Sequence, residues 1–360
     1  MFSITFVCVL VFTILIGCET ISPVSVEPAS DLQHIFSAQS QGWLGADVAC
    51  SIPIPVASQF SFWIFGDTLI GKSDGQRRVI EGMPRNSAAL LNIETLQPYF
   101  LLHNDNQKPF FPPVGPNSWL WPIWLYSTSS DSINVLSYSV VDDASDPFGF
   151  KVNSTVLSTI TDLARNPFEW TINSHNLEFT NCDFTLAAGV LHYQHYVYFI
   201  GVERFGGVSR NLLLRSESQK PLKSSNIDIV VLNGSLPTYI PLTSYSPSLN
   251  TPLSFAEGTS EGSLLYWKEH FFWFYNDAFS CSIDYRVAKR FEGPWSESKV
   301  LYVVPERFRK EQRFFYAPKV HLELSSENEL ILTYATNSFD QDELEDAELY
   351  VPRFIRSIWQ

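Results

Sequence analysis

Strand-like runs of aromatic and β-branched residues recur along this chain at a spacing that constrains its fold. Five such runs lie at residues 60–65, 133–141, 196–200, 271–275 and 329–334. Their starts are roughly 55–75 residues apart, which is the scale of a repeated supersecondary unit and too long for single hairpins. Each unit has room for about four short strands. Gly, Pro, Asn and Ser residues fall between the runs, as turns require.

The composition favours sheets over helices. Of the 360 residues, 45% are hydrophobic and 15% are aromatic. Aromatic and β-branched residues are enriched in strands, and no long segment after the N-terminus has Ala, Leu, Glu and Lys at helical spacing. Because five units fill the chain, we expect an all-β fold that is a five-bladed β-propeller. A pair of two-layer β-sandwiches is the alternative.

The N-terminal segment has the pattern of an export signal. Residues 1–17 are largely apolar, without Lys or Arg, and a small residue precedes Cys18, as in a bacterial lipobox. We therefore predict a signal peptide over 1–18 with lipid attached to Cys18, a flexible tether over 19–35 and a propeller over 36–360. The protein is then exported to the bacterial cell envelope and anchored to the membrane by lipid. Secretion without an anchor is the alternative.

Charge and cysteine content exclude several classes of function. The formal net charge is -14, and neutralising phosphates requires a basic surface, so nucleic acid is not an expected partner. Two of the 5 Cys lie in the leader, and the other three show neither a disulfide framework nor metal-ligand spacing. His residues also lack metal-ligand spacing. We predict a monomer without metal or cofactor, although the sequence leaves a structural cation in the funnel open.

Three acidic residues stand at the ends of strand-like runs. Asp47 follows a Gly-Ala pair, Asp67 follows the run at 60–65, and Glu261 comes just before another apolar run. A sheet holds residues at strand ends rigidly, and glycoside hydrolysis requires a pair of positioned carboxylates. The structural alternatives are Asp residues that cap turns and an exposed loop Glu.

Other residue types in these strings are suited to binding a sugar. The guanidinium of Arg85 can clamp a carboxylate or a hydroxyl, and Asn86 can bond the same ligand. An ion pair between Arg85 and Asp67 is the structural alternative, and it would lower the pKa of Asp67. Trp121, within a cluster of three Trp residues, can form a platform for a sugar ring or pack in the core. His321 opens the last repeat, where it can reach the channel or be a structural histidine.

Seven strings, taken in order, carry a resemblance to a known family. They lie at residues 45–53, 63–68, 85–87, 293–296, 316–321, 333–338 and 350–354. This set resembles a family of five-bladed propeller proteins long described as a domain of unknown function, some of whose bacterial relatives are regarded as endo-D-arabinanases. It is also similar in architecture to the arabinanase and β-fructosidase propellers. The resemblance covers nearly all of residues 40–359.

The resemblance implies which residues line the central funnel. Asp47 matches the first-blade carboxylate, Asp67 matches the second string, and Glu261 falls where the family places a Glu before a strand. His321 and Arg353 match strings of the final blade and line the funnel.

We therefore predict a glycoside hydrolase that acts on a furanose-containing, arabinan-like polysaccharide or oligosaccharide. Asp47 is the base or nucleophile, Asp67 orients it and tunes its pKa, and Glu261 is the acid. The alternative is a non-catalytic, glycan-binding envelope lipoprotein.

Overall fold

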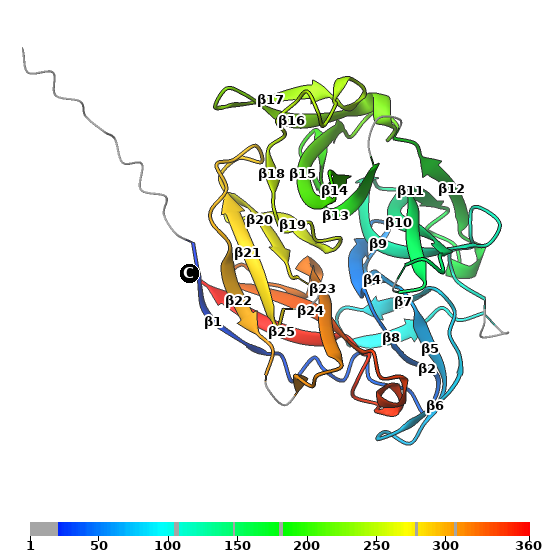
Figure 1. Cartoon of the computed structure of the whole chain (residues 1–360). Coiled ribbons are helices and arrows are strands. Elements are labelled where there is room, and N and C mark those ends of the chain that lie inside the picture. Colours follow the sequence, from blue (N-terminus) through cyan, green and yellow to red (C-terminus); the bar gives the residue numbers. More distant parts are fainter. Residues whose placement is uncertain (1–20, 104–107, 147, 180–182, 278–279, 306–307) are drawn as a thin grey trace, which may run out of the picture.

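The described part of the chain is an all-β, five-bladed β-propeller (Figure 1). The computed structural model describes residues 21–360 except 104–107, 147, 180–182, 278–279 and 306–307. Within that part, the regular elements are strands and short 3-10 helices. Among the described helices, none has the length and apolar character to cross a membrane. Residues 1–18, including the predicted lipid site Cys18, lie outside the described residues.

Each blade is an antiparallel sheet, and in blades 2 to 4 its strands follow one another along the chain. Blade 1 contains β3 (Cys50–Ile54), β4 (Ala57–Phe65), β7 (Ser87–Asn92) and β8 (Gln97–Phe100). Blade 2 contains β9 (Ser118–Ser129), β10 (Ser132–Asp142), β11 (Phe150–Thr161) and β12 (Thr171–Leu177). Blade 3 contains β13 (Asp183–Tyr193), β14 (Tyr196–Phe205), β15 (Val208–Glu217), β16 (Ile227–Asn233), β17 (Leu236–Pro241) and the short β18 (Ser254–Phe255). Blade 4 contains β19 (Gly262–Trp267), β20 (His270–Tyr275), β21 (Ser282–Ala288) and β22 (Lys299–Val303).

Blade 5 joins the two ends of the described chain. It contains β23 (Arg313–Val320), β24 (Glu329–Ser338), β25 (Arg353–Trp359) and, as its outer strand, β1 (Pro23–Pro28). β1 pairs antiparallel with β25 (Figure 1). The propeller therefore extends into the 19–35 segment that we expected to be a flexible tether, because residues 23–28 pair with β25.

The blades contact one another in chain order through their first strands. β3 contacts β9, β9 contacts β13, β13 contacts β19, and β19 contacts β23. Blade 5 returns to blade 1 where the ring of His321 stacks on Trp63 of β4, with centroids 4.3 Å apart. These contacts complete a ring of blades around one centre.

The five runs that the sequence singled out are the second strands of the five blades, namely β4, β10, β14, β20 and β24. Successive side chains of a strand point to opposite faces, and a second strand lies between two neighbouring blades. In β20, Phe272 contacts Trp359 of blade 5 at 5.4 Å, whereas Trp273 stacks on Phe255 of blade 3 at 5.1 Å. Such a strand must be apolar on both faces, which explains why these five segments are continuous runs of apolar residues.

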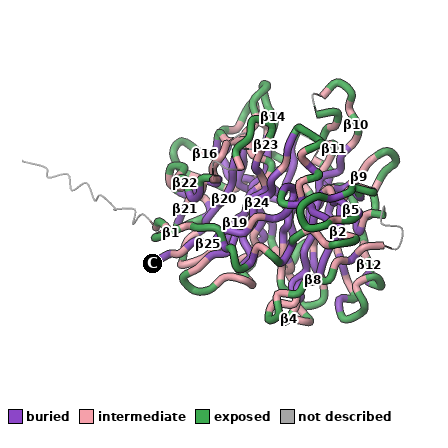
Figure 2. Tube along the Cα trace, turned by 90° about the horizontal axis from the view of Figure 1, so that it is seen from below, coloured by how far each residue is buried: buried purple, intermediate pink, exposed green. Residues whose placement is uncertain are grey.

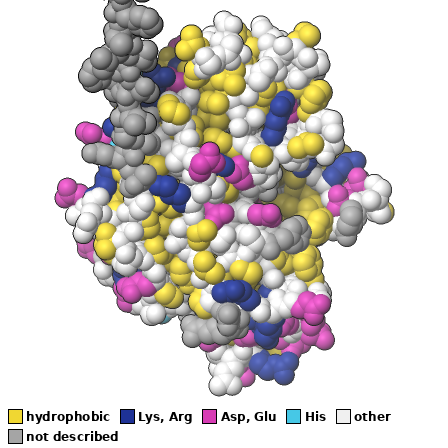
Figure 3. All heavy atoms as spheres, turned by 60° about the vertical axis from the view of Figure 1, so that its left-hand side comes forward, with side chains coloured by type: hydrophobic (Ala, Val, Ile, Leu, Met, Phe, Trp, Pro, Cys, Tyr) yellow, Lys and Arg dark blue, Asp and Glu magenta, His cyan; other side chains and the backbone are white. Residues whose placement is uncertain are grey.

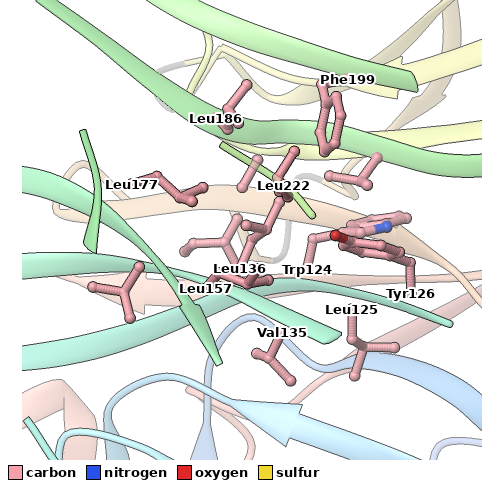
Figure 4. Packing of buried hydrophobic residues seen from close by; sticks show 14 of the residues in the cluster. Trp124, Leu125, Tyr126, Val135, Leu136, Leu157, Leu177, Leu186, Phe199 and Leu222 are labelled. Carbon is pink, nitrogen blue, oxygen red and sulfur yellow. The ribbon is translucent and has the colours of Figure 1, made fainter. Parts of the chain in front are cut away.

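Apolar side chains fill the space between adjacent blades. Between blades 2 and 3, Trp124, Leu136 and Leu157 pack with Leu186 and Phe199 (Figure 4). Figure 2 shows buried residues concentrated toward the middle of the molecule and exposed residues on the loops. On the face shown in Figure 3, Lys and Arg side chains are scattered among acidic and apolar ones and form no continuous basic patch.

A small additional sheet beside blade 1 positions the acidic strings. It contains β2 (Gln41–Ala46), β5 (Thr68–Ser73) and β6 (Arg78–Gly82). The buried guanidinium of Arg78 donates to the carbonyl oxygens of Leu44 at 2.6 Å and Leu344 at 2.6 Å. Because a buried guanidinium requires such acceptors, Arg78 ties this sheet to the loop that precedes β25.

Candidate active site

Asp47 and Asp67 lie beside each other at strand ends, as the sequence predicted. Asp47 comes directly after β2, and Asp67 lies between β4 and β5. The Gly66 N–H donates to the backbone oxygen of Asp47 at 3.3 Å, and a Cβ at Gly66 would overlap Oδ1 of Asp47. Val48 and Ala49 have left-handed φ values of 66° and 50°, which are costly for these residues. A strained turn and a glycine thus hold the Asp47 carboxylate in place.

Two tyrosines from the last blade bind the Asp47 carboxylate. The Tyr316 hydroxyl donates to Oδ2 at 2.7 Å, and the Tyr350 hydroxyl donates to the same oxygen at 3.1 Å. Asn337 in turn donates to the Tyr316 hydroxyl at 3.2 Å. The other carboxylate oxygen, Oδ1, is buried and has no hydrogen-bond partner among the described residues. One oxygen of Asp47 is therefore held by two hydroxyls, and the other has no hydrogen-bond partner among the described residues.

Burial raises the pKa of Asp47 to about 8. The negative charges of Asp67 and Glu261 act in the same direction, whereas the hydrogen bonds from Tyr316 and Tyr350 oppose the shift. The three carboxylates that we predicted are therefore close enough to influence one another, although they come from blade 1 and blade 4.

The Asp67 carboxylate is held on both sides. Arg85 Nη1 lies 3.2 Å from Oδ2, and Trp121 Nε1 donates to Oδ1 at 3.0 Å. The Arg85 guanidinium lies over the Trp119 ring, 4.6 Å from its centroid. Burial raises the pKa of Asp67, and the charge of Arg85 opposes that shift. The ion pair that was one of two interpretations of Arg85 is present, and Trp121 contacts the acidic site directly.

Glu261 comes just before β19 and pairs with a buried lysine. Oε2 of Glu261 lies 3.6 Å from Nζ of Lys319, and neither atom has a hydrogen-bond partner among the described residues. The Lys319 side chain is fully buried, and its Nζ lies 5.1 Å from the centroid of the Trp124 ring. Burial raises the pKa of Glu261, while Lys319 opposes the shift.

The sequence analysis missed Tyr316 and Lys319, although both belong to a string that it singled out. It chose His321 from residues 316–321. In β23 the register shifts between Tyr316 and Lys319, and Ala317 has a φ of 53°. This irregularity breaks the simple alternation of side chains, so that both residues contact acidic side chains of the site.

Three other predicted ligands have structural contacts away from the carboxylates. His321 is fully buried between the hydroxyls of Ser51 at 2.6 Å and Thr333 at 2.8 Å, and burial lowers its pKa to about 3. Its neutral ring packs in the core. The expectation that His321 lines the funnel is therefore wrong.

Asn86 and Arg353 are likewise bonded elsewhere. Asn86 is buried, donates to the Leu120 carbonyl at 2.9 Å and accepts from the Phe111 N–H at 2.7 Å. Arg353 lies 3.7 Å from Glu348 and over the Phe308 ring at 4.9 Å. The fold uses both residues to fix loops, since Asn86 also donates to the Phe111 carbonyl at 3.1 Å and Arg353 donates to the Glu348 carbonyl.

Within the described ranges, no group of three or more His, Cys, Asp or Glu side chains has an arrangement that could hold a metal ion. The site contains carboxylates, phenols, a guanidinium and an ammonium group. These are the groups of acid–base chemistry and of hydrogen bonding to hydroxyls.

A protein-family model described as "Domain of unknown function (DUF5005)" matches residues 31–225 and 246–358. No curated protein matches the chain. Among solved structures, a "putative hydrolase" from Bacteroides ovatus superposes with a TM-score of 0.72 at 16% identity, covering 92% of this chain and 90% of that chain.

Two further structures superpose more loosely. A GH43_1 enzyme from Xanthomonas citri complexed with xylotriose gives a TM-score of 0.48 at 12% identity, covering 91% of each chain. The catalytic domain of a GH62 α-L-arabinofuranosidase from Coprinopsis cinerea gives 0.47 at 8% identity, covering 90% of this chain and 96% of that chain. The Bacteroides likeness concerns the fold, and the two looser ones support no further conclusion.

Proposed function

Because the chain belongs to the DUF5005 family, whose description assigns no activity, we propose a function from the site itself. The protein is a glycoside hydrolase that cleaves a furanose-containing, arabinan-like polysaccharide. The furanose preference rests on the resemblance of the sequence strings to propellers that act on such sugars. The hydrolytic chemistry rests on the carboxylates.

One observation carries the proposal. Asp47 and Glu261 each have a buried carboxylate oxygen, Oδ1 and Oε2, that has no hydrogen-bond partner within the described residues. Buried polar atoms of a purely structural carboxylate are almost always satisfied. One oxygen each of Glu203, Glu257 and Asp284 is also without a partner among the described residues, and Oε2 of Glu261 faces Lys319. Asp47 and Glu261 differ from those carboxylates because they share one site, where the charge of Glu261 helps to raise the pKa of Asp47, and glycoside hydrolysis requires such a pair of carboxylates.

The contacts distinguish the roles of the two carboxylates. Tyr316 and Tyr350 stabilise the anionic form of Asp47 through Oδ2, which leaves Oδ1 to act as the base or nucleophile. Glu261 has a raised pKa because it is buried, as a proton donor to the leaving oxygen requires. Because the base or nucleophile must be ionised, the Asp47 pKa of about 8 predicts that kcat/KM rises with pH along an acidic limb near that pH.

Asp67 is the positioning carboxylate. Both of its oxygens are occupied, by Arg85 and Trp121, so it is not available to attack a substrate. Its charge contributes to the raised pKa of Asp47. Asp67 therefore acts on the reaction through Asp47, and Trp121 and Arg85 act through Asp67.

The experiment is a screen of the purified propeller against arabinan, xylan, galactan and fructan, with released reducing sugar as the readout. Release by the wild type and none by Asp47→Asn, with unchanged circular dichroism, supports the proposal. Tight binding of a polysaccharide without release of sugar would instead identify a non-catalytic glycan-binding protein. If the protein neither binds nor cleaves any of these polysaccharides, a carbohydrate function is overturned altogether.

A further inference from the structure

A row of aromatic rings connects the two ends of the acidic site. Each ring contacts the next, and we call the row the aromatic arch; its members in order are Trp121, Phe150, Phe148, Phe339, Phe314 and Tyr316. Successive ring centroids are 4.7, 6.1, 6.3, 4.6 and 5.4 Å apart. Both ends of the arch contact the acidic site, since Trp121 donates to Asp67 and Tyr316 donates to Asp47.

The arch joins two blades that are not neighbours in the ring. Phe148 and Phe150 belong to blade 2, whereas Phe314 lies in β23 of blade 5 and Phe339 follows β24. Blade 1, which carries Asp47 and Asp67, stands between those two blades. The contact between Phe148 and Phe339 therefore spans the side of the site that blade 1 provides.

The two central rings are exposed rather than buried in a core. Phe148 is 56% exposed and Phe339 is 48% exposed. Large exposed aromatic side chains that adjoin one another are typical of interaction sites. Two further rings join each of them to a carboxylate, Phe150 and Trp121 toward Asp67 and Phe314 and Tyr316 toward Asp47. We infer that a ligand held by Asp47 and Glu261 extends along this row onto the two exposed rings.

Backbone hydrogen bonds fix both central rings. The Phe148 N–H donates to Oδ1 of Asp146 at 2.8 Å, and Gly149 takes a left-handed φ of 75° that glycine adopts readily. The Phe339 N–H donates to the Gln312 carbonyl at 2.9 Å. These bonds hold the backbone at Phe148 and Phe339, which lowers the ordering entropy that binding on the rings costs.

We propose that the aromatic arch binds the sugar units of a neutral oligosaccharide that lie beyond the reacting unit. This inference rests on the proposed function and assigns its extended binding site. The apolar C–H faces of sugar rings stack on Phe148 and Phe339, which form a platform without charged groups of their own. Asp143, Asp146 and Asp340 flank these rings in the sequence, so the arch favours neutral sugars over uronic acids.

The test uses α-1,5-linked arabino-oligosaccharides of two to five units as probes, with a xylo-oligosaccharide series in parallel. Binding is measured by calorimetry on Asp47→Asn, which prevents turnover, and on the same chain with Phe148→Ala and Phe339→Ala. We expect affinity to increase with chain length when the arch is intact. Loss of each ring should reduce the affinity for the longest probe about five- to tenfold and remove the gain with length.

Two further variants keep the test specific. Phe205→Ala removes a ring that is 46% exposed on blade 3 and should retain the gain with length. Phe148→Leu keeps apolar bulk and folding while it removes the aromatic face, and should behave like Phe148→Ala.

The outcomes separate the two proposals. If the wild type hydrolyses a polysaccharide but the arch variants retain the full gain with length, the arch is overturned and the proposed function stands. If Asp47→Asn binds no probe although the wild type cleaves arabinan, the arch is again overturned. If the wild type neither binds nor cleaves any carbohydrate, both proposals fail.

Discussion

Nζ of Lys319 lies 3.6 Å from Oε2 of Glu261, and the lysine side chain is fully buried. A buried ammonium is costly unless a negative charge compensates it. The pair links β23 of blade 5 to the entrance of β19 in blade 4. Lys319 therefore sets the charge state of Glu261 and is the positioning residue of the proposed acid.

Lys319→Met should shift the pH optimum upward. Lys319 lowers the pKa of Glu261, so its removal raises that pKa and moves the alkaline limb and the optimum of kcat/KM to higher pH. Lys220→Met, which removes a surface lysine paired with Glu217 at 2.9 Å, is the matched control. An unchanged optimum in Lys319→Met would show that the ion pair serves stability alone.

Trp121→Phe should lower kcat/KM about 10–100-fold, which is the cost of one hydrogen bond to a charged group. The substitution removes the Nε1 donor to Asp67 and keeps a ring that can pack against Phe150. Trp119→Phe is the control, because Nε1 of Trp119 has no partner among the described residues. Equal effects of the two substitutions in steady-state kinetics would contradict a specific role for the bond to Asp67.

Gly66→Ala should abolish most of the activity and destabilise the fold by about 1–3 kcal/mol, the range of overpacking substitutions. The new Cβ would overlap Oδ1 of Asp47, so the carboxylate must move away from its position. Gly115→Ala is the control, since its Cβ would meet Ser118 at an ordinary 3.7 Å. Thermal unfolding and kinetics on both variants check the prediction, which fails if Gly66→Ala keeps wild-type kcat/KM.

Asp47→Asn should become relatively more stable than the wild type as pH rises from about 4 to 8. The folded pKa of Asp47 is raised from 3.8 to about 8. Between these values the unfolded state has lost the proton and the folded state retains it, so wild-type stability falls with rising pH. Asn cannot ionise and avoids this loss. The difference in Tm should grow by about 2–6 °C between pH 5 and pH 8; a constant difference would contradict the shifted pKa.

The sequence was most informative for strands that are buried on both faces. The runs at 60–65 and 271–275 are such strands, and their spacing led to the five blades. The outer strand β1 was mistaken for a tether, because its pairing with β25 joins segments more than three hundred residues apart and leaves little local pattern. Edge strands with one exposed face resemble loops in composition.

The acidic residues of the site were predictable because they adjoin strands, but their partners were not. Tyr316 and Tyr350 contact Asp47 across a long sequence separation, and both positions depend on left-handed backbone, at Ala317 and at Tyr350 itself. His321 was predicted because it opens the last repeat and matches a final-blade string, and nothing in the local pattern reveals the register shift in β23 that brings Lys319 to the site. Local pattern cannot encode such tertiary geometry.

The central claim is that Asp47 and Glu261 have different roles in one hydrolytic reaction, and paired substrates test it most directly. Asp47→Asn and Glu261→Gln are assayed on the polysaccharide that the wild type cleaves and on a dinitrophenyl glycoside of the same sugar, whose leaving group needs no proton. The account predicts that Asp47→Asn loses both activities, whereas Glu261→Gln loses the polysaccharide activity and retains the activity on the dinitrophenyl glycoside. Retention of polysaccharide hydrolysis by Asp47→Asn would contradict it.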